Sequence, residues 1–502
     1  MQFSLNGQQV EVDDDGANLL DVLRERLGIT SAKDGCSPQG QCGCCTVLVD
    51  GSPRVACVTP ARRVDGRAVT TLEGLDPAER DRWAHALLAT GGSQCGFCTP
   101  GIVLRLAATA AHDVDTALLA HLCRCTGWQT IAEAVDALAS QDRDLGAASE
   151  RATIEGRTPQ RVGTDVVLGA GGFAEDTAPP DALVAVPTTD GGWAVAATLH
   201  AARRSAGKVQ GRRTTRPPAH PIELPPGDWD ITLRTTWVEP AALEPDASWC
   251  APGGEPATPL GNGGAFGAKT TSPAPAAARR LADEHGRPVR VVLSREDTVR
   301  LGPKRPPMAA GINRDGTGTI RVARTPGIAD AIHAMAPGLT VEEVDVAGPP
   351  TSAAIRAAGW AEAAILLAAA GGRAHVTSPD GAEAEATIDA TTDAITVRLR
   401  AGVPLDEVVL RSYAIGAAHM GLGWVTSEGL FVDEAGDPHD LTIRSFGILR
   451  AKDMPAVTVE IDRTDDRPPC NGSDAVFAAV AAAAWLERGL PTDWPTERGS
   501  FQ

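Results

Sequence analysis

"CSPQGQCGCC" (Cys36 to Cys45) places four cysteines within ten residues of a 502-residue chain that contains eleven cysteines in all. Nine of the eleven precede residue 126, and neighbouring cysteines at such spacings cannot form disulfides without strain. The opening sequence, "MQFSLNGQQVEVDDDG", has no basic segment followed by an apolar one, so we expect no export signal and a cytoplasmic protein with reduced thiols. A metal site is therefore a better interpretation of the cysteines than a disulfide framework.

The first group of thiols combines one glycine-rich loop with one returning segment. Cys36, Cys42 and Cys45 lie on the loop, and Cys57 follows a predicted strand and turn. Four thiolates arranged in this way suit a 2Fe-2S cluster, because the loop can wrap the cluster with its amides facing the sulfurs. A structural zinc site is the alternative, but it usually appears as two separated CxxC knuckles. Cys44 is surplus, and Cys45 is preferred as the ligand because two residues separate it from Cys42.

A second group of thiols stands at the ends of predicted helices. "QCGFC" contains Cys95 and Cys98, and "LCRC" contains Cys123 and Cys125. Two such pairs can meet around one cluster where a helical bundle brings the helix ends together, and helix N-terminal amides stabilise the more negative, reduced state. The short CxC spacing is uncommon in zinc knuckles, so it again favours a 2Fe-2S cluster.

The rest of the pattern predicts an α+β chain of several units. Its length predicts roughly three or more domains. Polar and apolar residues alternate around Asn6-Gly7, as in a hairpin, and a leucine-lined helix follows. Further on, four short amphipathic segments indicate a helical bundle. We therefore expect a sheet with one helix over residues 1–75, a helical domain over 76–145, a linker over 146–165, and two α+β regions over 166–370 and 371–502.

Three of these segments resemble the paired 2Fe-2S domains of the xanthine dehydrogenase family of molybdenum hydroxylases. They are "DGCSPQGQCGCCTVLVDG", "SQCGFCTPG" and "HLCRCTGWQTIAEAV", and the resemblance covers about residues 1–140. It implies a plant-ferredoxin-like β-grasp domain and a four-helix domain that pass electrons one at a time from a molybdenum-pterin centre. Gln94 and Cys125 match the positions nearest the pterin. The implied cluster ligands are Cys36, Cys42, Cys45, Cys57, Cys95, Cys98, Cys123 and Cys125. The sequence departs from the family pattern at Cys44, where alanine is usual.

The later part of the chain resembles a shortened, divergent form of the family's molybdopterin-binding subunit. "GNGGAFGAKT" (Gly261 to Thr270) is similar to that subunit's glycine-rich loop, which implies that Gly263, Gly264, Phe266 and Gly267 bind the cofactor. The family holds its pterin with glutamine-containing loops, since an amide can both donate and accept hydrogen bonds. However, residues 211–501 contain no glutamine. A complete pterin cage is therefore not expected, and binding of a molybdenum-pterin cofactor stays open.

Asp474 is the candidate for the catalytic base. The resemblance places a glutamate near the C-terminus, and "CNGSDAVFAAVAAAAW" (from Cys470) offers Asp474 as the nearest carboxylate. Its side chain is one methylene shorter, which would leave the oxygen roughly 1 Å from the required place. We favour the interpretation that Asp474 is the N-cap of the alanine-rich helix that follows.

Charge and motif content limit the partners. The net charge of −18 and pI of about 5.0 argue against nucleic acid, and the longest apolar run, Ala475 to Leu486, is too short for a membrane span. Lys304-Arg305 and Arg212-Arg213 are expected as solvated surface charge, with an anionic cofactor tail as the alternative. No segment resembles the family's FAD domain, so this chain is expected to lack FAD and a flavoprotein would be a partner.

Three interpretations of function remain open. In the leading one, the chain is an iron-sulfur oxidoreductase component that relays single electrons for hydroxylation of a small-molecule heterocycle or aldehyde, with flavoprotein and molybdenum subunits as partners. In the second, the fused region keeps a working molybdopterin site and oxidises substrate unaided. In the third, the fused region is a non-catalytic scaffold that docks the iron-sulfur module onto a partner.

Overall fold

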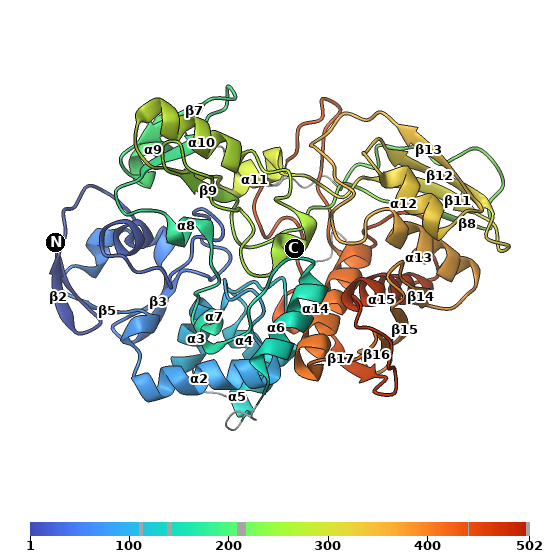
Figure 1. Cartoon of the computed structure of the whole chain (residues 1–502), viewed down its shortest axis with the longest axis horizontal. Coiled ribbons are helices and arrows are strands. Elements are labelled where there is room, and N and C mark those ends of the chain that lie inside the picture. Colours follow the sequence, from blue (N-terminus) through green and yellow to red (C-terminus); the bar gives the residue numbers. More distant parts are fainter. Residues whose placement is uncertain (110–113, 138–142, 208–216, 440, 498–502) are drawn as a thin grey trace.

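The structure is a computed structural model. It describes residues 1–109, 114–137, 143–207, 217–439 and 441–497. The chain runs from a small sheet and a helical bundle at one side, through a second sheet, to two further sheets and two long helices at the other side (Figure 1).

The N-terminal sheet has the strand order β2-β1-β5-β3-β4. β1 and β2 form an antiparallel hairpin whose turn, Asn6-Gly7, has positive φ at both residues. α1 (Leu19–Asp21) continues into a helical turn, Val22–Arg26, that buries Leu19, Leu20 and Leu23. The expected small sheet with a helix beside it is therefore present. Its strands are β1 (Gln2–Leu5), β2 (Gln8–Glu11), β3 (Thr46–Val49), β4 (Ser52–Val55) and β5 (Ala68–Thr70).

A bundle of short helices follows, as the amphipathic periodicity predicts. The local sequence sets the ends of its first helix: the Asp76 carboxylate accepts from the amides of the first turn, Pro77 opens the helix, and Gly91 ends it in the left-handed region. The two cysteine pairs of the second group lie in the connections between these helices: one pair lies between the first and second helices, and the other lies between the third and fourth. The helices are α2 (Pro77–Thr90), α3 (Thr99–Ala107), α4 (Val114–Ala117) and α5 (Gln129–Asp136).

Residues 146–165, expected as a linker, are ordered and largely helical. α6 (Leu145–Gly156) occupies most of this stretch, and α7 (Thr164–Val167) begins at its end. The side chain of Arg151 in α6 is fully buried and binds Glu155, with 2.5 Å between Nη2 and Oε1. The charged residues on which the linker prediction rested are thus partly inside the protein.

A four-stranded sheet of order β7-β6-β10-β9 comes next, flanked by two helices (Figure 1). β10 runs parallel to β6 and antiparallel to β9. The glycine-rich loop of residues 261–270 lies between β9 and α10 of this unit. Its elements are α8 (Ala174–Thr177), β6 (Leu183–Pro187), β7 (Trp193–Ala196), α9 (Leu199–Ala206), β9 (Ala247–Cys250), α10 (Ala274–His285) and β10 (Val289–Val292).

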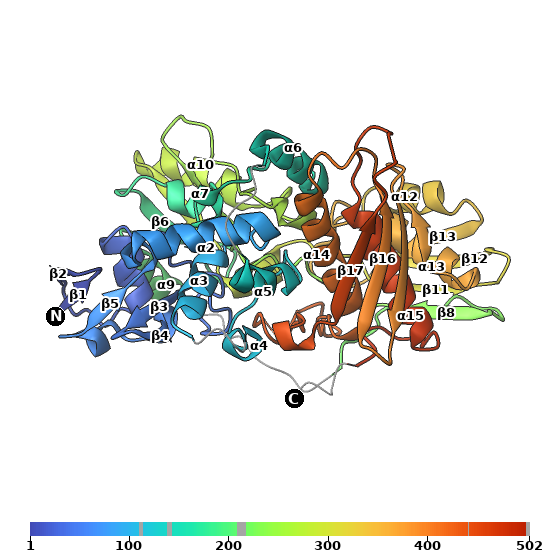
Figure 2. The ribbon, with the colours of Figure 1, turned by 90° about the horizontal axis from the view of Figure 1, so that it is seen from below.

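Two more four-stranded sheets, β13-β12-β11-β8 and β14-β15-β16-β17, complete the α+β architecture. α15 packs on the second of them and against α14, and α14 lies between this sheet and the helical bundle (Figure 2). The first sheet and its helices are α11 (Arg295–Leu301), β8 (Ile231–Arg234), β11 (Met308–Ile312), β12 (Gly318–Ala323), α12 (Ile328–Met335), β13 (Leu339–Val344) and α13 (Trp360–Ala370). The second comprises β14 (His375–Thr377), β15 (Glu383–Asp389), β16 (Ala394–Arg400), α14 (Glu407–Thr426), β17 (Ala456–Ile461) and α15 (Ser473–Glu487).

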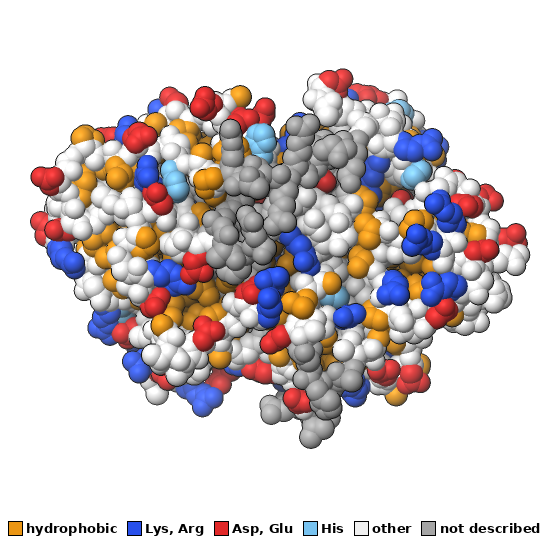
Figure 3. Space-filling view, turned by 180° about the vertical axis from the view of Figure 1, so that it is seen from behind, with side chains coloured by type: hydrophobic (Ala, Val, Ile, Leu, Met, Phe, Trp, Pro, Cys, Tyr) orange, Lys and Arg blue, Asp and Glu red, His pale blue; other side chains and the backbone are white. Residues whose placement is uncertain are grey.

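The surface carries both signs of charge. On the face drawn in Figure 3, acidic and basic side chains are interspersed among apolar ones. None of the helices in the described ranges combines the length and the apolar character that a membrane span requires.

Small residues let α14 approach the second group of cysteines closely. A Cβ at Gly416 would lie 1.7 Å from the carbonyl oxygen of Cys125, and a Cβ at Gly421 would lie 2.5 Å from that of Phe477 on α15. Packed interiors do not absorb an extra methyl group without backbone movement. α14 therefore fixes the position of the Cys125 segment through backbone contact.

We predict that Gly416→Ala destabilises the protein by about 1–3 kcal/mol, because the new methyl group must displace the Cys125 segment. The measurement is the midpoint of thermal unfolding. Gly371→Ala is the matched control, since a Cβ at Gly371 would lie 3.5 Å from its nearest neighbour and the residue has a helical φ of −78°. Equal midpoints for the two variants would contradict this account of α14 packing.

Candidate metal centres

The first four expected ligands converge in the interior. Cys36, Cys42, Cys45 and Cys57 are all buried, on the loop before β3 and the turn after β4. Hydrogen bonds link their sulfurs in the order Cys42, Cys36, Cys57, Cys45. Four thiols from two segments, linked in sequence through their sulfurs, are the type and number of donors that a 2Fe-2S cluster requires.

Backbone amides point at these sulfurs. The amide of Gln39 donates to Cys36 Sγ at 3.3 Å, and the amide of Cys57 donates to Cys45 Sγ at 3.4 Å. Hydrogen bonds from the Cys42 and Cys57 thiols lower the pKa of Cys36, and backbone hydrogen bonds from residues that include Gln39 add to this effect. At Cys36, these amides thus favour the thiolate, which is the form of cysteine that binds iron.

Cys44 is buried beside this group. Its sulfur has a long contact, 3.9 Å, with the carbonyl oxygen of Cys42. Gly35 separates these sulfurs from the later part of the chain: a Cβ there would lie 3.1 Å from Cys42 Sγ, 3.2 Å from Cys44 Sγ and 3.1 Å from the carbonyl oxygen of Leu243. The thiol that the sequence left over is therefore packed against the group and is not exposed to solvent.

The second four expected ligands also converge, as two pairs. Cys95 and Cys125 have their sulfurs 3.6 Å apart, and a thiol hydrogen bond joins Cys98 to Cys123. Cys98 stands at the N-cap of α3, and Cys123 and Cys125 lie in the loop before α5. One helix end and one loop therefore supply this group, whose four thiols are the type and number of donors that a second 2Fe-2S cluster would need.

Hydrogen bonds also support these sulfurs. The amide of Phe97 donates to Cys95 Sγ at 3.4 Å, and the Thr126 hydroxyl lies 3.1 Å from Cys123 Sγ. The pKa of Cys123 falls to about 6, chiefly through its hydrogen bond with Cys98 and with help from Thr126. In contrast, the hydrogen bond with Cys95, together with burial, raises the pKa of Cys125.

The two groups of thiols touch through the backbone. The amide of Leu122 donates to the carbonyl oxygen of Cys42 at 3.0 Å. The His121 ring covers Gly43, where a Cβ would lie 2.4 Å from the ring, and its Nε2 is 3.2 Å from Thr46 Oγ1. One hydrogen bond thus connects Cys42 of the first group to the residue that precedes Cys123.

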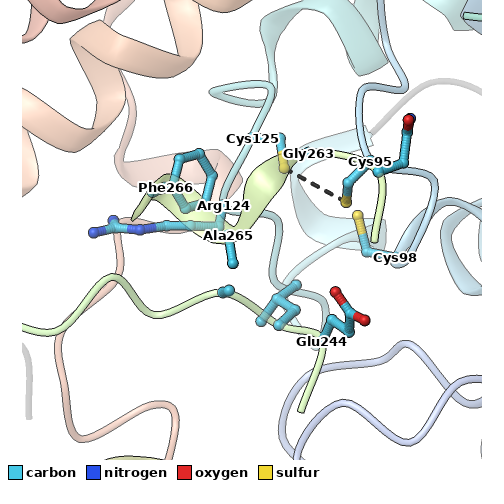
Figure 4. A pocket seen from close by; sticks show the side chains of 11 residues that line it. Cys95, Cys98, Arg124, Cys125, Glu244, Gly263, Ala265 and Phe266 are labelled. Atoms are coloured by element: carbon cyan, nitrogen blue, oxygen red, sulfur yellow. Dashed lines mark hydrogen bonds between the residues drawn. The ribbon is translucent and has the colours of Figure 1, made fainter. Parts of the chain in front are cut away.

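A pocket joins the second group to the glycine-rich loop. Figure 4 shows the sulfurs of Cys95, Cys98 and Cys125 gathered at one side of it, while the side chain of Arg124 points away from them. The second cysteine group and the glycine-rich loop therefore line one pocket. The lining residues are Cys95, Cys98, Arg124, Cys125, Ala242, Leu243, Glu244, Asn262, Gly263, Ala265 and Phe266.

The glycines expected to bind a pterin are packed against the chain itself. A Cβ at Gly263 would lie 2.7 Å from Cys95 Cβ, one at Gly264 would lie 2.7 Å from the Gly156 carbonyl oxygen, and one at Gly267 would lie 1.8 Å from that of Ala354. Phe266, with a φ of 56°, lines the pocket. These glycines permit close approach between protein segments.

The side chain of Gln94 is likewise engaged. Its Nε2 donates to the Cys125 carbonyl oxygen at 3.0 Å and to Ser412 Oγ on α14 at 2.9 Å. Gln94 therefore holds the second cysteine group and α14 together. The Gln94 amide and the glycine-rich loop thus make their described contacts with the chain itself.

Asp474 is not an N-cap, which corrects the sequence interpretation. The cap position of α15 is Gly472, and the side chain of Asn471 accepts from the Asp474 amide at 2.9 Å. The buried carboxylate of Asp474 instead pairs with two arginines: Oδ2 is 2.9 Å from Arg157 Nε, and Oδ1 is 3.4 Å from Arg356 Nε. Both oxygens are therefore committed to ion pairs.

Buried ion pairs are the feature that sequence reasoning missed. Lys304 and Arg305, expected on the surface, are buried, and Arg305 Nη1 lies 2.7 Å from Glu362 Oε1. Arg124 pairs with Glu428 in the interior. Local sequence gives no signal for such pairs, because their members are far apart in the chain. The Arg212-Arg213 prediction lies outside the described residues.

Two family models match the part of the chain that carries the cysteines. Residues 3–69 match the 2Fe-2S iron-sulfur cluster binding domain, and residues 71–136 match the [2Fe-2S] binding domain. The xanthine dehydrogenase iron-sulfur-binding subunit of Escherichia coli O157:H7 is 39% identical over 132 residues, which are 24% of this chain and 80% of that protein. The nicotinate dehydrogenase small FeS subunit of Eubacterium barkeri is 37% identical over 144 residues, which are 27% of this chain and 91% of that protein.

The fold of the whole chain has a solved counterpart. The aldehyde oxidoreductase from Desulfovibrio desulfuricans aligns over 96% of this chain and 97% of its own, with a TM-score of 0.70 at 15% identity. At that identity the likeness concerns the fold alone. Together with the two 2Fe-2S domains and the relatives that match them, it shows that the chain belongs to the xanthine dehydrogenase family of molybdenum hydroxylases, as an oxidoreductase whose iron-sulfur part is fused to a region of aldehyde oxidoreductase fold.

Proposed function

We propose that this chain relays single electrons through two 2Fe-2S clusters in a xanthine dehydrogenase-type molybdenum hydroxylase. A 2Fe-2S cluster takes up and releases one electron, at a potential set by hydrogen bonds to its sulfurs and by burial. The chain's own residues would hold two clusters and shield them from water. We assign residues 1–75 and 76–145 as the two carrier domains. The proposed ligands are Cys36, Cys42, Cys45 and Cys57 for the first cluster, and Cys95, Cys98, Cys123 and Cys125 for the second.

The observation that carries this proposal is the hydrogen bond between the two groups. The Leu122 amide donates to the Cys42 carbonyl oxygen at 3.0 Å, and Leu122 is bonded to Cys123. A proposed ligand of one cluster is thus one hydrogen bond and one peptide unit from a proposed ligand of the other. Such close coupling suits a relay.

The later part of the chain supports the relay by covering its first loop. The amide of Ile443 donates to Gln39 Oε1 at 3.1 Å, and Arg444 Nε donates to the Gln41 carbonyl oxygen at 3.0 Å. Solvent access is one of the properties that sets the potential of a cluster. Residues 166–370 and 371–502, which we assign as a shortened molybdopterin-binding-like region, would therefore act as a protein cover for the clusters.

We assign substrate oxidation to a partner molybdenum subunit and electron acceptance to a flavoprotein. Two observations support this assignment: Gly263, Gly267 and Asp474 are engaged with the chain itself, and relatives of the iron-sulfur part are named as subunits of dehydrogenases. The complex would oxidise a small heterocycle or an aldehyde.

Metal content and electron uptake test this function. We expect the purified chain to contain about four irons and to accept about two electrons per chain in an anaerobic reductive titration, because each 2Fe-2S cluster holds two irons and takes one electron. Molybdenum should be absent by mass spectrometry. Molybdenum near one per chain would instead support a self-contained hydroxylase, and zinc in place of iron would remove the relay.

The assignment of Cys45 in preference to Cys44 has its own test. We predict that Cys45→Ser loses about two irons per chain and the visible absorption of one cluster, because it removes a proposed ligand. The matched variant Cys44→Ser should keep both clusters, since that thiol lies beside the ligands without being one. The reverse outcome would make Cys44 the ligand.

A further inference from the structure

Arg124 occupies an unusual position between two proposed cluster ligands, Cys123 and Cys125. The residue is 2% exposed, and its side chain points away from the neighbouring sulfurs (Figure 4). Buried guanidinium groups need an acidic partner and filled hydrogen bonds, since a buried unpaired charge is strongly unfavourable. The contacts of Arg124 therefore show what the Cys123–Cys125 segment is attached to.

Arg124 is attached to the later part of the chain at two places. Its Nη2 donates to Glu428 Oε2 at 2.7 Å, and its Nη1 donates to Glu428 Oε1, so the ion pair is bidentate. Its Nε donates to the Pro240 carbonyl oxygen at 3.0 Å. A bidentate arginine–carboxylate pair fixes both orientation and distance. The backbone between the two cysteines thus has a rigid support.

Glu428 is itself held in place. It follows α14 and is 1% exposed, and its amide donates to the Gly423 carbonyl oxygen at 2.9 Å. Room for its carboxylate exists because Gly423 has no side chain: a Cβ there would lie 2.4 Å from Glu428 Oε1. The carboxylate is therefore preorganised by the end of α14.

We propose that Glu428 is a positioning residue for the second cluster, which fixes the Cys123–Cys125 segment through Arg124 and balances the positive charge there. This inference deepens the proposed relay and rests on it. In this proposal, the end of α14 influences the geometry and the reduction potential of the second cluster, and it does not influence the first. The contacts of Gln94 with Ser412 and of Gly416 with the Cys125 segment show that α14 supports the same segment elsewhere.

The sign of the effect follows from charge. In Glu428→Gln, the carboxamide can still accept from Arg124, but the negative charge is lost and the positive charge beside the second cluster is no longer balanced. An added positive charge favours the reduced, more negative state, so the reduction potential of the second cluster should rise. Glu428→Asp keeps the charge but withdraws the carboxylate, so it should alter geometry with a smaller change in potential.

The test uses the full-length chain with its clusters assembled. Iron content is measured first, and each cluster is then followed by EPR during a redox titration. The Cys45→Ser variant, which lacks the first cluster, identifies the signal of the second. Glu362→Gln is the matched control, because the Arg305–Glu362 pair is equally buried, with 2.7 Å between Nη1 and Oε1. This pair links the segment before β11 to α13, and Arg305 also stacks on Trp424 of α14, so the control tests whether loss of any buried carboxylate beside α14 gives the same shift.

The expected result is full iron content in Glu428→Gln, a raised potential for the second cluster, an unchanged first cluster, and no shift in Glu362→Gln. Unchanged signals in Glu428→Gln, equal shifts of both clusters, or the same shift in the control would overturn the proposal. If Glu428→Gln does not fold, Glu428→Asp decides: we expect an altered EPR signal of the second cluster alone, and an unaltered signal rejects the positioning role. A wild-type chain without clusters would reject the relay itself.

Discussion

The convergence of two groups of thiols is the constraint on which the rest of the structure depends. Thiols in contact disfavour one another's ionisation, and burial adds to this: both effects raise the pKa values of Cys42, Cys98 and Cys125. Raised pKa values favour the protonated form of these three thiols. Iron must displace their protons as it binds, so cluster assembly should become more favourable as pH rises.

The later part of the chain contributes contact at the level of the backbone. Gly416 meets the Cys125 carbonyl group and Gly263 meets Cys95 at distances that leave no room for a side chain, and Gly35 meets the Leu243 carbonyl group at a distance that leaves little room. Three segments that are remote in sequence therefore enclose the cysteine loops. Packing that excludes water also removes the solvation of a reduced cluster's charge. The contacts of the later part of the chain with the cysteine loops would therefore influence the reduction potential of a cluster bound there.

Much of this organisation could be predicted from sequence, but only where the signal is local. Cysteine spacing, the Asn6-Gly7 turn and the end of α2 at Gly91 are determined by neighbouring residues, and the structure contains them. Burial of charge was not predictable. Arg124 and Glu428 are 304 residues apart, and neither shows its partner in the sequence around it.

The glycine-rich loop shows why a family pattern does not by itself assign a cofactor. Gly264 and Gly267 retain the spacing of a pterin-binding loop, yet the Gly156 and Ala354 carbonyl groups fill the space that their missing side chains leave. The carboxylate of Asp474, between Arg157 and Arg356, is similarly satisfied without any ligand. Contacts within the chain are therefore a sufficient reason for Gly264, Gly267 and Asp474 to stand at these positions. A region that keeps the family fold for this reason can serve the iron-sulfur domains as a cover, whether or not it does chemistry of its own.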